Sequence, residues 1–315
     1  MQRVATEEAV RPTDAREGKG KRALITGLRG FTGAYLAREL SAAGYRVFGT
    51  ALAGDAGGPD IFTVDLLDRA AVAGMIEQVQ PDVVAHLAGI AFVGHDNAEQ
   101  IYRVNVAGTR NLLEALAASP HKPSSVLLAS SANIYGNARV ALIDEDVAPM
   151  PANDYAVSKL AMEYMARLWM DKLPIVIARP FNYTGVGQSE NFLLPKIVAH
   201  FRKGARRIEL GNLAIARDFS DVRMVASSYR RLLAAPGDSA GRAFNVCSGR
   251  SDSLESVIAT MGEIAGYRIE VQVNPAFVRA NDVLTLTGDN ARLAGVIGAV
   301  QPIPLADTLR WMYEA

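Results

Sequence analysis

The 315-residue chain is poor in cysteine, in net charge and in long apolar runs. Its one cysteine, Cys247, cannot form an internal disulfide, which fits a reducing compartment, and a lone cysteine is more often a core residue than a nucleophile. No apolar run approaches the roughly 20 residues that span a bilayer, and the polar N-terminus lacks a signal-peptide core. We therefore expect a cytoplasmic location, no membrane partner, and a flexible leader over residues 1–20.

The charges of the chain are balanced, with 33 basic and 33 acidic residues. No global positive field is available to hold a nucleic acid, so we expect no nucleic-acid partner. A polyanionic substrate would need a local basic site. We expect no metal ion. Half of the residues are hydrophobic, which supplies a large core, and at about 150 residues per domain the length suggests two domains or one large one.

Short apolar runs alternate with amphipathic stretches through the first 180 residues. This alternation predicts an α/β fold with a Rossmann-like, doubly wound parallel sheet. The expected strands are Ala23–Thr26, Tyr45–Thr50, Asp60–Val64, Asp82–Leu87, Ser125–Ala129 and Pro174–Ala178. The longest expected helices are Thr32–Ala43, Glu99–Ala118 and Tyr155–Met170.

After Pro180 the pattern changes to helices mixed with short strands, and Ala243–Val246 reads as a strand that returns to the sheet. We therefore expect a smaller C-terminal α/β domain and more than one crossing between the domains. The expected dinucleotide-binding domain covers residues 21–181 plus about 220–247. The expected substrate domain covers residues 182–219 plus 248–315.

A glycine-rich segment follows the first expected strand. Gly27, Gly30 and Gly33 have G-x-x-G-x-x-G spacing, with Phe31 between the last two. Glycine lets the backbone approach a pyrophosphate, and the N-terminus of the following helix attracts its negative charge. The position between a strand and a helix therefore predicts a dinucleotide site, although the same glycines also suit a plain tight turn.

The end of the second expected strand carries no acidic residue to bind ribose hydroxyls and repel a 2′-phosphate. Arg29, in the loop, could meet a 2′-phosphate or be a solvated surface charge. We therefore expect NADP(H), slightly favoured over NAD(H). Asp65 and Leu66, past the third strand, are placed to bind the adenine edge. Asp65 could instead cap the next helix.

Tyr155 and Lys159 are four residues apart, so on a helix they share one face. A nearby ammonium favours the phenolate, and lowering the tyrosine pKa by about 3 units requires about 4 kcal/mol. We expect Tyr155 to be the catalytic acid–base group and Lys159 to tune it and to hold the nicotinamide ribose.

Two polar residues complete the expected catalytic group. Ser131 follows a parallel strand, where hydroxyls face the ligand crevice, and could donate a hydrogen bond to a substrate oxygen. It could instead only cap a turn. Asn105, in an apolar helix, could kink that helix and assist a proton relay to Lys159, or be a satisfied buried amide.

These motifs together resemble the extended short-chain dehydrogenase/reductase (NAD-dependent epimerase/dehydratase) family, from about Arg22 to Ala315. Further marks are His86-Leu87-Ala88-Gly89, Gly108-Thr109 and Ser-Ser-x-x-x-Tyr-Gly. The resemblance implies an enzyme, cofactor contacts at Leu87, Ala88, Gly89 and Asn105, and a homodimer through the helices near 99–118 and 155–170.

The C-terminal half resembles the branch that handles GDP-mannose-derived sugars, above all its GDP-4-keto-6-deoxy-mannose reductases. Its marks include the segment from Gly211 to Phe219. The resemblance implies a GDP-sugar site, with arginines whose planar forks pair with phosphate oxygens. The substrate-binding residues that it implies, besides Ser131, are Asn133, Asn182, Lys196, Asn212, Arg217, Arg279 and Asp282.

Two departures concern the chemistry and the sugar contacts. Related dehydratases carry a glutamate base where this chain has Asn133, and an amide cannot remove a proton as a carboxylate does. Related reductases often carry histidine at Tyr183. We therefore expect NAD(P)H-dependent reduction of the C4 keto group of a GDP-4-keto-6-deoxy sugar, giving a GDP-D-rhamnose or GDP-6-deoxytalose type product. The alternatives are a nucleotide-sugar 4-epimerase, a GDP-mannose 4,6-dehydratase-like enzyme, and a non-enzymatic dinucleotide sensor.

Overall fold

The computed structural model describes residues 16–52, 54, 57–91, 97–136, 138, 140–213, 215–275 and 285–315. Arg279 and Asp282 therefore lie outside the described residues. Among the helices that are described, none combines the length and the apolar character that a membrane crossing requires.

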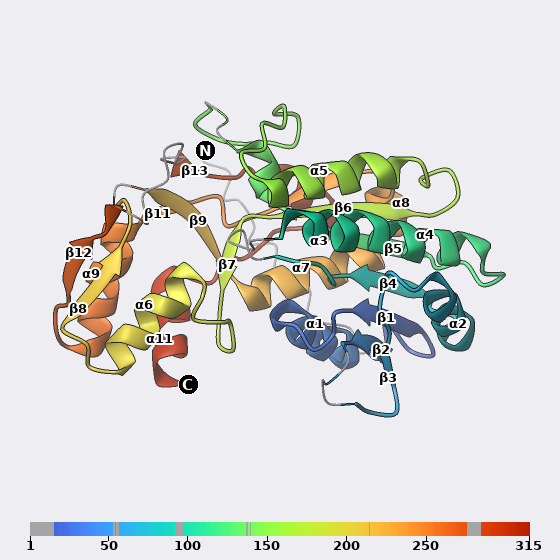
Figure 1. Cartoon of the computed structure of the whole chain (residues 1–315), viewed down its shortest axis with the longest axis horizontal. Coiled ribbons are helices and arrows are strands. Elements are labelled where there is room, and N and C mark those ends of the chain that lie inside the picture. The colour runs from blue at the N-terminus through green and yellow to red at the C-terminus, as the bar shows by residue number, and fades with distance from the viewer. Residues whose placement is uncertain are drawn as a thin grey trace, which may run out of the picture.

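A seven-stranded parallel sheet forms the larger part of the molecule, in the order β10-β6-β5-β4-β1-β2-β3 (Figure 1). Its strands are β1 (Arg22–Thr26), β2 (Arg46–Ala51), β3 (Ile61–Thr63), β4 (Val83–His86), β5 (Ser125–Ala129), β6 (Ile175–Pro180) and β10 (Ala243–Val246). The order reverses direction between β1 and β4, and ligands of such sheets bind at the carboxyl ends of the strands flanking that point. The expected Rossmann-like α/β class is confirmed.

Helices cover both faces of this sheet because its strands are apolar on both sides. The helices are α1 (Phe31–Ala42), α2 (Arg69–Val79), α4 (Thr109–Ala118), α5 (Asp154–Arg167), α7 (Val222–Ala234) and α8 (Pro236–Ser239). Ala23 and Ile25 of β1 pack with α1 and α7, whereas Leu24 packs with α2, α4 and α5. This alternation follows from the two-residue period of a strand.

The helical run expected at Glu99–Ala118 is present but is not one regular α-helix. It consists of α3 (Ala98–Tyr102), the π-helical segment η1 (Arg103–Gly108) and α4. A π segment inserts one residue into the helical register and is frequent at functional sites. Asn105 lies inside η1 and is 1% exposed, so the irregular turn coincides with a buried polar side chain.

A smaller region follows β6 in the chain and lies beside the large sheet (Figure 1). Its strands are β7 (Asn182–Thr184), β8 (Arg207–Leu210), β9 (Ala216–Asp221), β11 (Ser251–Ser253), β12 (Glu270–Val273) and β13 (Thr285–Leu286). Its helices are α6 (Leu193–Arg202), α9 (Leu254–Ala265) and α11 (Leu305–Glu314), which share one apolar cluster with β8.

The helix α10 (Ala291–Ile297) departs from this division. It lies in the range expected for the substrate domain, yet Leu293 and Ile297 pack into the cluster that α1 and α7 form on the large sheet. The chain therefore returns to the large sheet once more before α11. The short 3-10 turn η2 (Ala132–Tyr135) follows β5 and precedes α5 in the chain.

Candidate active site

The glycine loop between β1 and α1 has the geometry of a phosphate cradle. Gly27 has φ of +73°, and a Cβ there would lie 3.0 Å from the backbone of Ala88. A Cβ on Gly33 would lie 2.3 Å from the carbonyl oxygen of Gly27. Among the described side chains none caps the N-terminus of α1, so its first N–H groups point into the loop. The loop therefore fits a dinucleotide pyrophosphate, which binds such helix ends.

The other expected cofactor residues surround this loop. Leu87 and Ala88 follow β4, and the Ala88 N–H donates to Thr26 Oγ1 at 3.2 Å. Arg29 is exposed, and its guanidinium donates to the carbonyl of Gly57 at 3.4 Å, across the loop that follows β2. Both Arg29 and the end of β2 therefore lie at the same side of the sheet.

The segment Asp65-Leu66 lies after β3, and the alternative role of Asp65 as a helix cap is wrong. Asp68 caps α2 by accepting from Ala70 and Ala71, whereas Asp65 Oδ1 accepts from Leu67 N at 2.9 Å in a local turn. Leu66 is buried in the core.

The catalytic candidates Ser131 and Tyr155 are brought together from β5 and α5. A side-chain hydrogen bond joins them and lowers the pKa of Tyr155. Ser131 Oγ also accepts from the backbone N and from Nδ2 of Asn133, both at 3.1 Å. Because Oγ accepts twice, its own hydrogen remains to be donated toward Tyr155 or a substrate oxygen. Ser131 is thus both the cap of η2 and a neighbour of Tyr155.

Lys159 lies one helical turn beyond Tyr155, as the spacing predicts. Its Nζ is 5.9 Å from the Tyr155 ring centroid and donates to the Ala129 carbonyl at 2.8 Å. A Cβ on Gly89 would lie 3.5 Å from Nζ, so the turn after β4 closes over the ammonium. Burial lowers the pKa of Lys159 to about 8, while the carboxylate of Glu163 raises it.

The expected lowering of the Tyr155 pKa is not what the structure gives. Burial raises this pKa to about 12, the hydrogen bond with Ser131 lowers it, and nearby Tyr183 raises it. Desolvation disfavours the phenolate more than the surrounding dipoles stabilise it. Tyr155 is therefore fully protonated at neutral pH, which suits a proton donor.

Asn105 clamps the turn that follows β4. Its Oδ1 accepts from Ile90 N at 2.9 Å, and its Nδ2 donates to the Ile90 carbonyl at 3.2 Å and to Ser158 Oγ at 3.0 Å. Both amide hydrogens are therefore used, which favours the satisfied-amide alternative. Ser158 in turn donates to the Tyr155 carbonyl at 2.7 Å, so the clamp reaches the catalytic helix.

Three residues of this site carry no motif in the sequence: Tyr183 was noted only as a departure from related reductases, and Glu163 and Arg179 were missed. Tyr183 contacts Thr32 of α1 through hydroxyls 2.8 Å apart and stacks on Phe31, so it lies between the glycine loop and Tyr155. Glu163 and Arg179 form a buried ion pair with contacts of 3.0 and 2.6 Å below Lys159. Glu163 falls one helical turn after Lys159, a spacing that could have indicated it.

The substrate candidates lie on the smaller region. Asn182 is in β7, which pairs with β9, the strand of Arg217. Arg217 is half-buried and donates to its neighbour's carbonyl, Ala216 O, at 2.9 Å. Asn212 follows β8 and is half-buried. The adjacent Asp218 is buried and accepts from the N–H groups of Ser248 and Gly249, which holds the next turn against β9.

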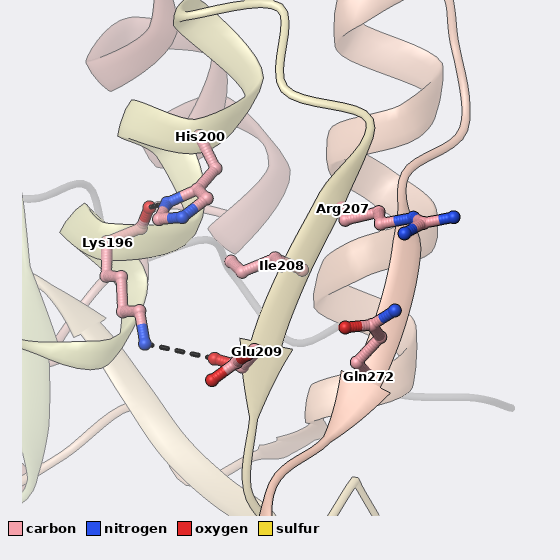
Figure 2. Close-up of a pocket in the computed structure, with 6 residues that line it drawn as sticks. All are labelled: Lys196, His200, Arg207, Ile208, Glu209 and Gln272. Carbon is pink, nitrogen blue, oxygen red and sulfur yellow. Dashed lines mark hydrogen bonds between the residues drawn. The ribbon is translucent and has the colours of Figure 1, made fainter.

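Lys196 borders a separate groove between α6 and the β8–β12 pair. Figure 2 shows its Nζ reaching across to β8, where it donates to the Glu209 carbonyl at 3.0 Å. The groove has a volume of about 360 Å³. Its lining residues are Lys196, His200, Arg207, Ile208, Glu209 and Gln272. None of them belongs to the group around Tyr155.

Comparison with known proteins agrees with this geometry. A model of the NAD dependent epimerase/dehydratase family matches residues 23–247. A GDP-6-deoxy-D-talose 4-dehydrogenase of Aggregatibacter actinomycetemcomitans is 34% identical over 278 residues, covering 87% of this chain and 90% of the relative. A GDP-6-deoxy-D-mannose reductase of Pseudomonas aeruginosa is 35% identical over 301 residues, covering 92% and 95%.

Solved structures show the same arrangement. A putative epimerase from Burkholderia cenocepacia superposes with a TM-score of 0.89 at 53% identity, covering 94% of this chain and 98% of that one. RMD from Pseudomonas aeruginosa complexed with NADPH superposes with a TM-score of 0.82 at 33% identity, covering 93% and 98%.

The fold and the glycine loop define a dinucleotide-dependent oxidoreductase of the Rossmann type. The chain belongs to the NAD dependent epimerase/dehydratase family. The expectations of an extended short-chain dehydrogenase/reductase enzyme and of an NAD(P) cofactor are therefore confirmed.

Proposed function

We propose that the chain reduces the C4 keto group of a GDP-4-keto-6-deoxy sugar with NAD(P)H, to a GDP-D-rhamnose or GDP-6-deoxytalose type product. The observation that carries the proposal is the alignment of Ser131, Tyr155 and Lys159 at the carboxyl ends of the central strands. The names of two relatives, a GDP-6-deoxy-D-mannose reductase and a GDP-6-deoxy-D-talose 4-dehydrogenase, support the GDP-sugar and the C4 position.

Residues of both sheet faces would hold the cofactor. The Gly27–Gly33 loop would take the pyrophosphate, Asp65 and Leu66 the adenine edge, and Lys159 the nicotinamide ribose. Bound nicotinamide would supply the hydride. We propose a slight preference for NADP(H), because Arg29 is exposed beside a strand end without an acidic residue.

The side chains of the protein would supply the proton and the geometry. Tyr155, protonated at neutral pH, would give its proton to the C4 oxygen as the carbonyl becomes an alcohol. Ser131 would donate its remaining hydrogen to the same oxygen and so orient the carbonyl. The cationic Lys159 would stabilise the phenolate that remains until Tyr155 is reprotonated.

The second region would bind the nucleotide end of the substrate. We propose a division of labour in which residues 21–181 and about 220–247 hold the cofactor and most of the remainder holds the sugar nucleotide. Asn182 and Arg217 lie on paired strands beside the catalytic side, which suits contacts to a diphosphate. Binding energy from that remote diphosphate would position the keto group for reaction.

Asn133 separates this proposal from the dehydratase alternative. Asn133 supplies no carboxylate base. Its amide nitrogen instead donates a hydrogen bond to Ser131 Oγ, which leaves the serine hydrogen to be donated elsewhere. The epimerase alternative uses the same tyrosine and lysine but returns the hydride to its substrate. It would therefore give no net change in nicotinamide oxidation.

The decisive experiment follows nicotinamide absorbance with purified enzyme, GDP-4-keto-6-deoxymannose and either NADPH or NADH. We expect stoichiometric oxidation of NAD(P)H, faster with NADPH, and a GDP-6-deoxyhexose product by mass spectrometry. An intact keto substrate with unoxidised cofactor would reject this substrate. Other nucleotide sugars would then be screened for epimerisation, and binding of the dinucleotide without any turnover would support the sensor alternative.

We also propose that the protein is a homodimer that docks through α5 and the 98–118 helical run. Val157 and Tyr164 of α5 and its C-cap residue Leu168 are 38%, 55% and 74% exposed and recur at helical spacing. Large apolar side chains gathered on one helix face favour a protein partner. Sedimentation of the wild-type chain checks the dimer, and a cytoplasmic location stays a prediction from the cysteine content.

A further inference from the structure

His86, at the end of β4, is a buried histidine outside the proposed catalytic group. It is 3% exposed, and both ring nitrogens have partners. Nδ1 lies 2.7 Å from Thr26 Oγ1 at the end of β1, and Nε2 lies 2.8 Å from Thr109 Oγ1 at the start of α4. The imidazole therefore joins the two strands at the switch point of the sheet to the helical run above them.

The directions of these hydrogen bonds follow from the available protons. Thr109 donates its single hydroxyl hydrogen to the Asn105 carbonyl at 2.7 Å, because a carbonyl can only accept. Thr109 must then accept from His86, so the ring proton of a neutral imidazole lies on Nε2. Nδ1 consequently accepts from Thr26, whose oxygen accepts from the Ala88 N–H at 3.2 Å.

The result is a one-way chain from Ala88 through Thr26, His86 and Thr109 to the backbone of Asn105. Both ends of this hydrogen-bond chain lie at the turn that follows β4, because Ala88 is part of that turn and the Asn105 side chain bonds to Ile90 in it. Ala88 precedes Gly89, and a Cβ on Gly89 would lie 2.8 Å from Asn105 Oδ1. The carbonyl that accepts from Thr109 belongs to Asn105 in η1, so this hydrogen-bond chain ends inside the π-helical segment.

We propose that His86, with its ring proton on Nε2, is a positioning residue that holds the Asn105 clamp and the Gly89–Ile90 turn in place for the nicotinamide ribose, Lys159 and Tyr155. The proposal rests on the proposed function for the roles of Lys159 and Tyr155. It assigns His86 no contact with substrate. The mechanical link is the Asn105 side chain, which grips Ile90 on one side and Ser158, next to Lys159, on the other.

Burial and charge keep this chain from reversing. Burial, together with the nearby Lys159 cation, lowers the pKa of His86 to about 3. A cationic imidazole would donate from both nitrogens, and Thr26 would have to turn its own hydrogen away. The one-way arrangement therefore persists at neutral pH, where the imidazole is uncharged.

The first test reads the tautomer directly in the full-length protein. Histidine ¹⁵N–¹H correlation spectra, with His86→Gln used for assignment, should show one ring that stays neutral from pH 5 to 9, with its hydrogen on Nε2. A hydrogen on Nδ1, or protonation of this ring near pH 6, would contradict the proposed direction of the hydrogen-bond chain and overturn the inference. This test needs neither substrate nor catalysis.

The second test asks whether the chain positions the cofactor site or only stabilises the fold. Thr109→Val removes the acceptor of the Nε2 hydrogen, and we expect the dissociation constant of NADPH to rise about tenfold, as for one unsatisfied buried donor. Thr109→Ser keeps the hydroxyl and should rescue most of that affinity. Ser239→Ala is a matched control, because it removes a buried hydroxyl of α8 that donates to the Leu232 carbonyl in α7.

The outcomes separate this inference from the proposed function. If Thr109→Val lowers the melting temperature as Ser239→Ala does but leaves NADPH binding unchanged, His86 is only structural. If cofactor binding changes as expected while GDP-4-keto-6-deoxymannose is not reduced, the substrate proposal fails and the positioning role stands. If Thr109→Val does not fold, the tautomer of His86 in the wild-type protein still tests the direction of the hydrogen-bond chain on which the proposal depends.

Discussion

The two sides of the active site are built differently. Around β4, β5 and α5, Ser131, Tyr155 and Lys159 are each less than 10% exposed, and each has a hydrogen-bond partner inside the protein. On the smaller region, Asn182 and Arg217 are only half-buried. The proposed reacting groups are thus locked before any ligand arrives, while the proposed recognition groups remain accessible.

This difference has a physical reason. Proton donors and ammonium groups act best when their geometry is preorganised in a site from which water is excluded. Groups that recognise a diphosphate must stay within reach of solvent, and Arg217, the proposed diphosphate contact, is half-buried and donates to the Ala216 carbonyl. Substitutions on the buried side should therefore lower kcat, and substitutions on the open side should mainly raise KM.

The sharpest way to break the comparison is Tyr155→Phe. The ring still packs, but the proton donor is lost, so we expect kcat to fall about a thousandfold. Pre-steady-state oxidation of NADPH measures the chemical step, and fluorescence titration should show unchanged cofactor binding. A loss of less than about tenfold would mean that another group donates the proton.

Lys159→Met should separate activity from stability. We expect about a hundredfold lower kcat, because the cation beside the phenolate is lost. The free energy of unfolding should not fall, since burial already lowers the Lys159 pKa to about 8 and thus opposes its charge.

The titration of the buried Lys159 predicts how the stability and the activity of the protein change with pH. An unfolded lysine holds its proton up to its ordinary pKa of 10.5, so the wild type should gain stability between about pH 8 and 10.5. Its reductase activity should decline above about pH 8 as the cation is lost, while Tyr155 stays protonated. In Lys159→Met both dependences should vanish, and their persistence would assign them to another group.

On the open side, Arg217→Ala should raise the KM for the GDP-sugar about tenfold and leave kcat nearly unchanged. The matched control is Arg46→Ala, which removes an exposed arginine at the opposite end of the sheet. A fall in kcat without a change in KM would mean that Arg217 acts in the chemical step, as the buried groups are proposed to do, and would contradict the difference between the two sides of the site.

The smallest expected effect is at Arg29. Arg29→Ala should reduce the preference for NADPH over NADH about fivefold, because the 2′-phosphate loses its guanidinium partner. The ratio of kcat/KM for the two cofactors measures this, with Arg69→Ala, an exposed arginine on α2, as the control. An unchanged ratio would leave Arg29 as a surface charge.

The sequence predicted those features that short stretches of chain decide. The strand Ala243–Val246 has the bounds expected for it, and Tyr155 and Lys159 share a helix face because four residues make about one turn. The run from Glu99 to Ala118 was helical as expected, but its π segment was missed. Hydrophobic spacing does not report that Thr109 takes the Asn105 carbonyl within a buried chain.

Electrostatics were harder to predict than positions. The Tyr155–Lys159 spacing suggested a lowered tyrosine pKa, whereas burial raises it. The charge of a neighbour is visible in a sequence, but the desolvation of a side chain depends on everything packed around it. Tyr183 was noticed only as a departure from relatives, and its contact with Thr32 across 151 positions became visible in the fold.

Local chemistry alone therefore specified the glycine loop, the tyrosine–lysine pair and the parallel sheet that carries them. Glycine conformations, helical period and strand alternation act within a few residues and need no distant partner. The meeting of Ser131 with Tyr155, the directions of the His86 hydrogen bonds and the raised tyrosine pKa required the folded chain. Each depends on groups 20 to 60 positions apart that only packing brings within hydrogen-bond distance.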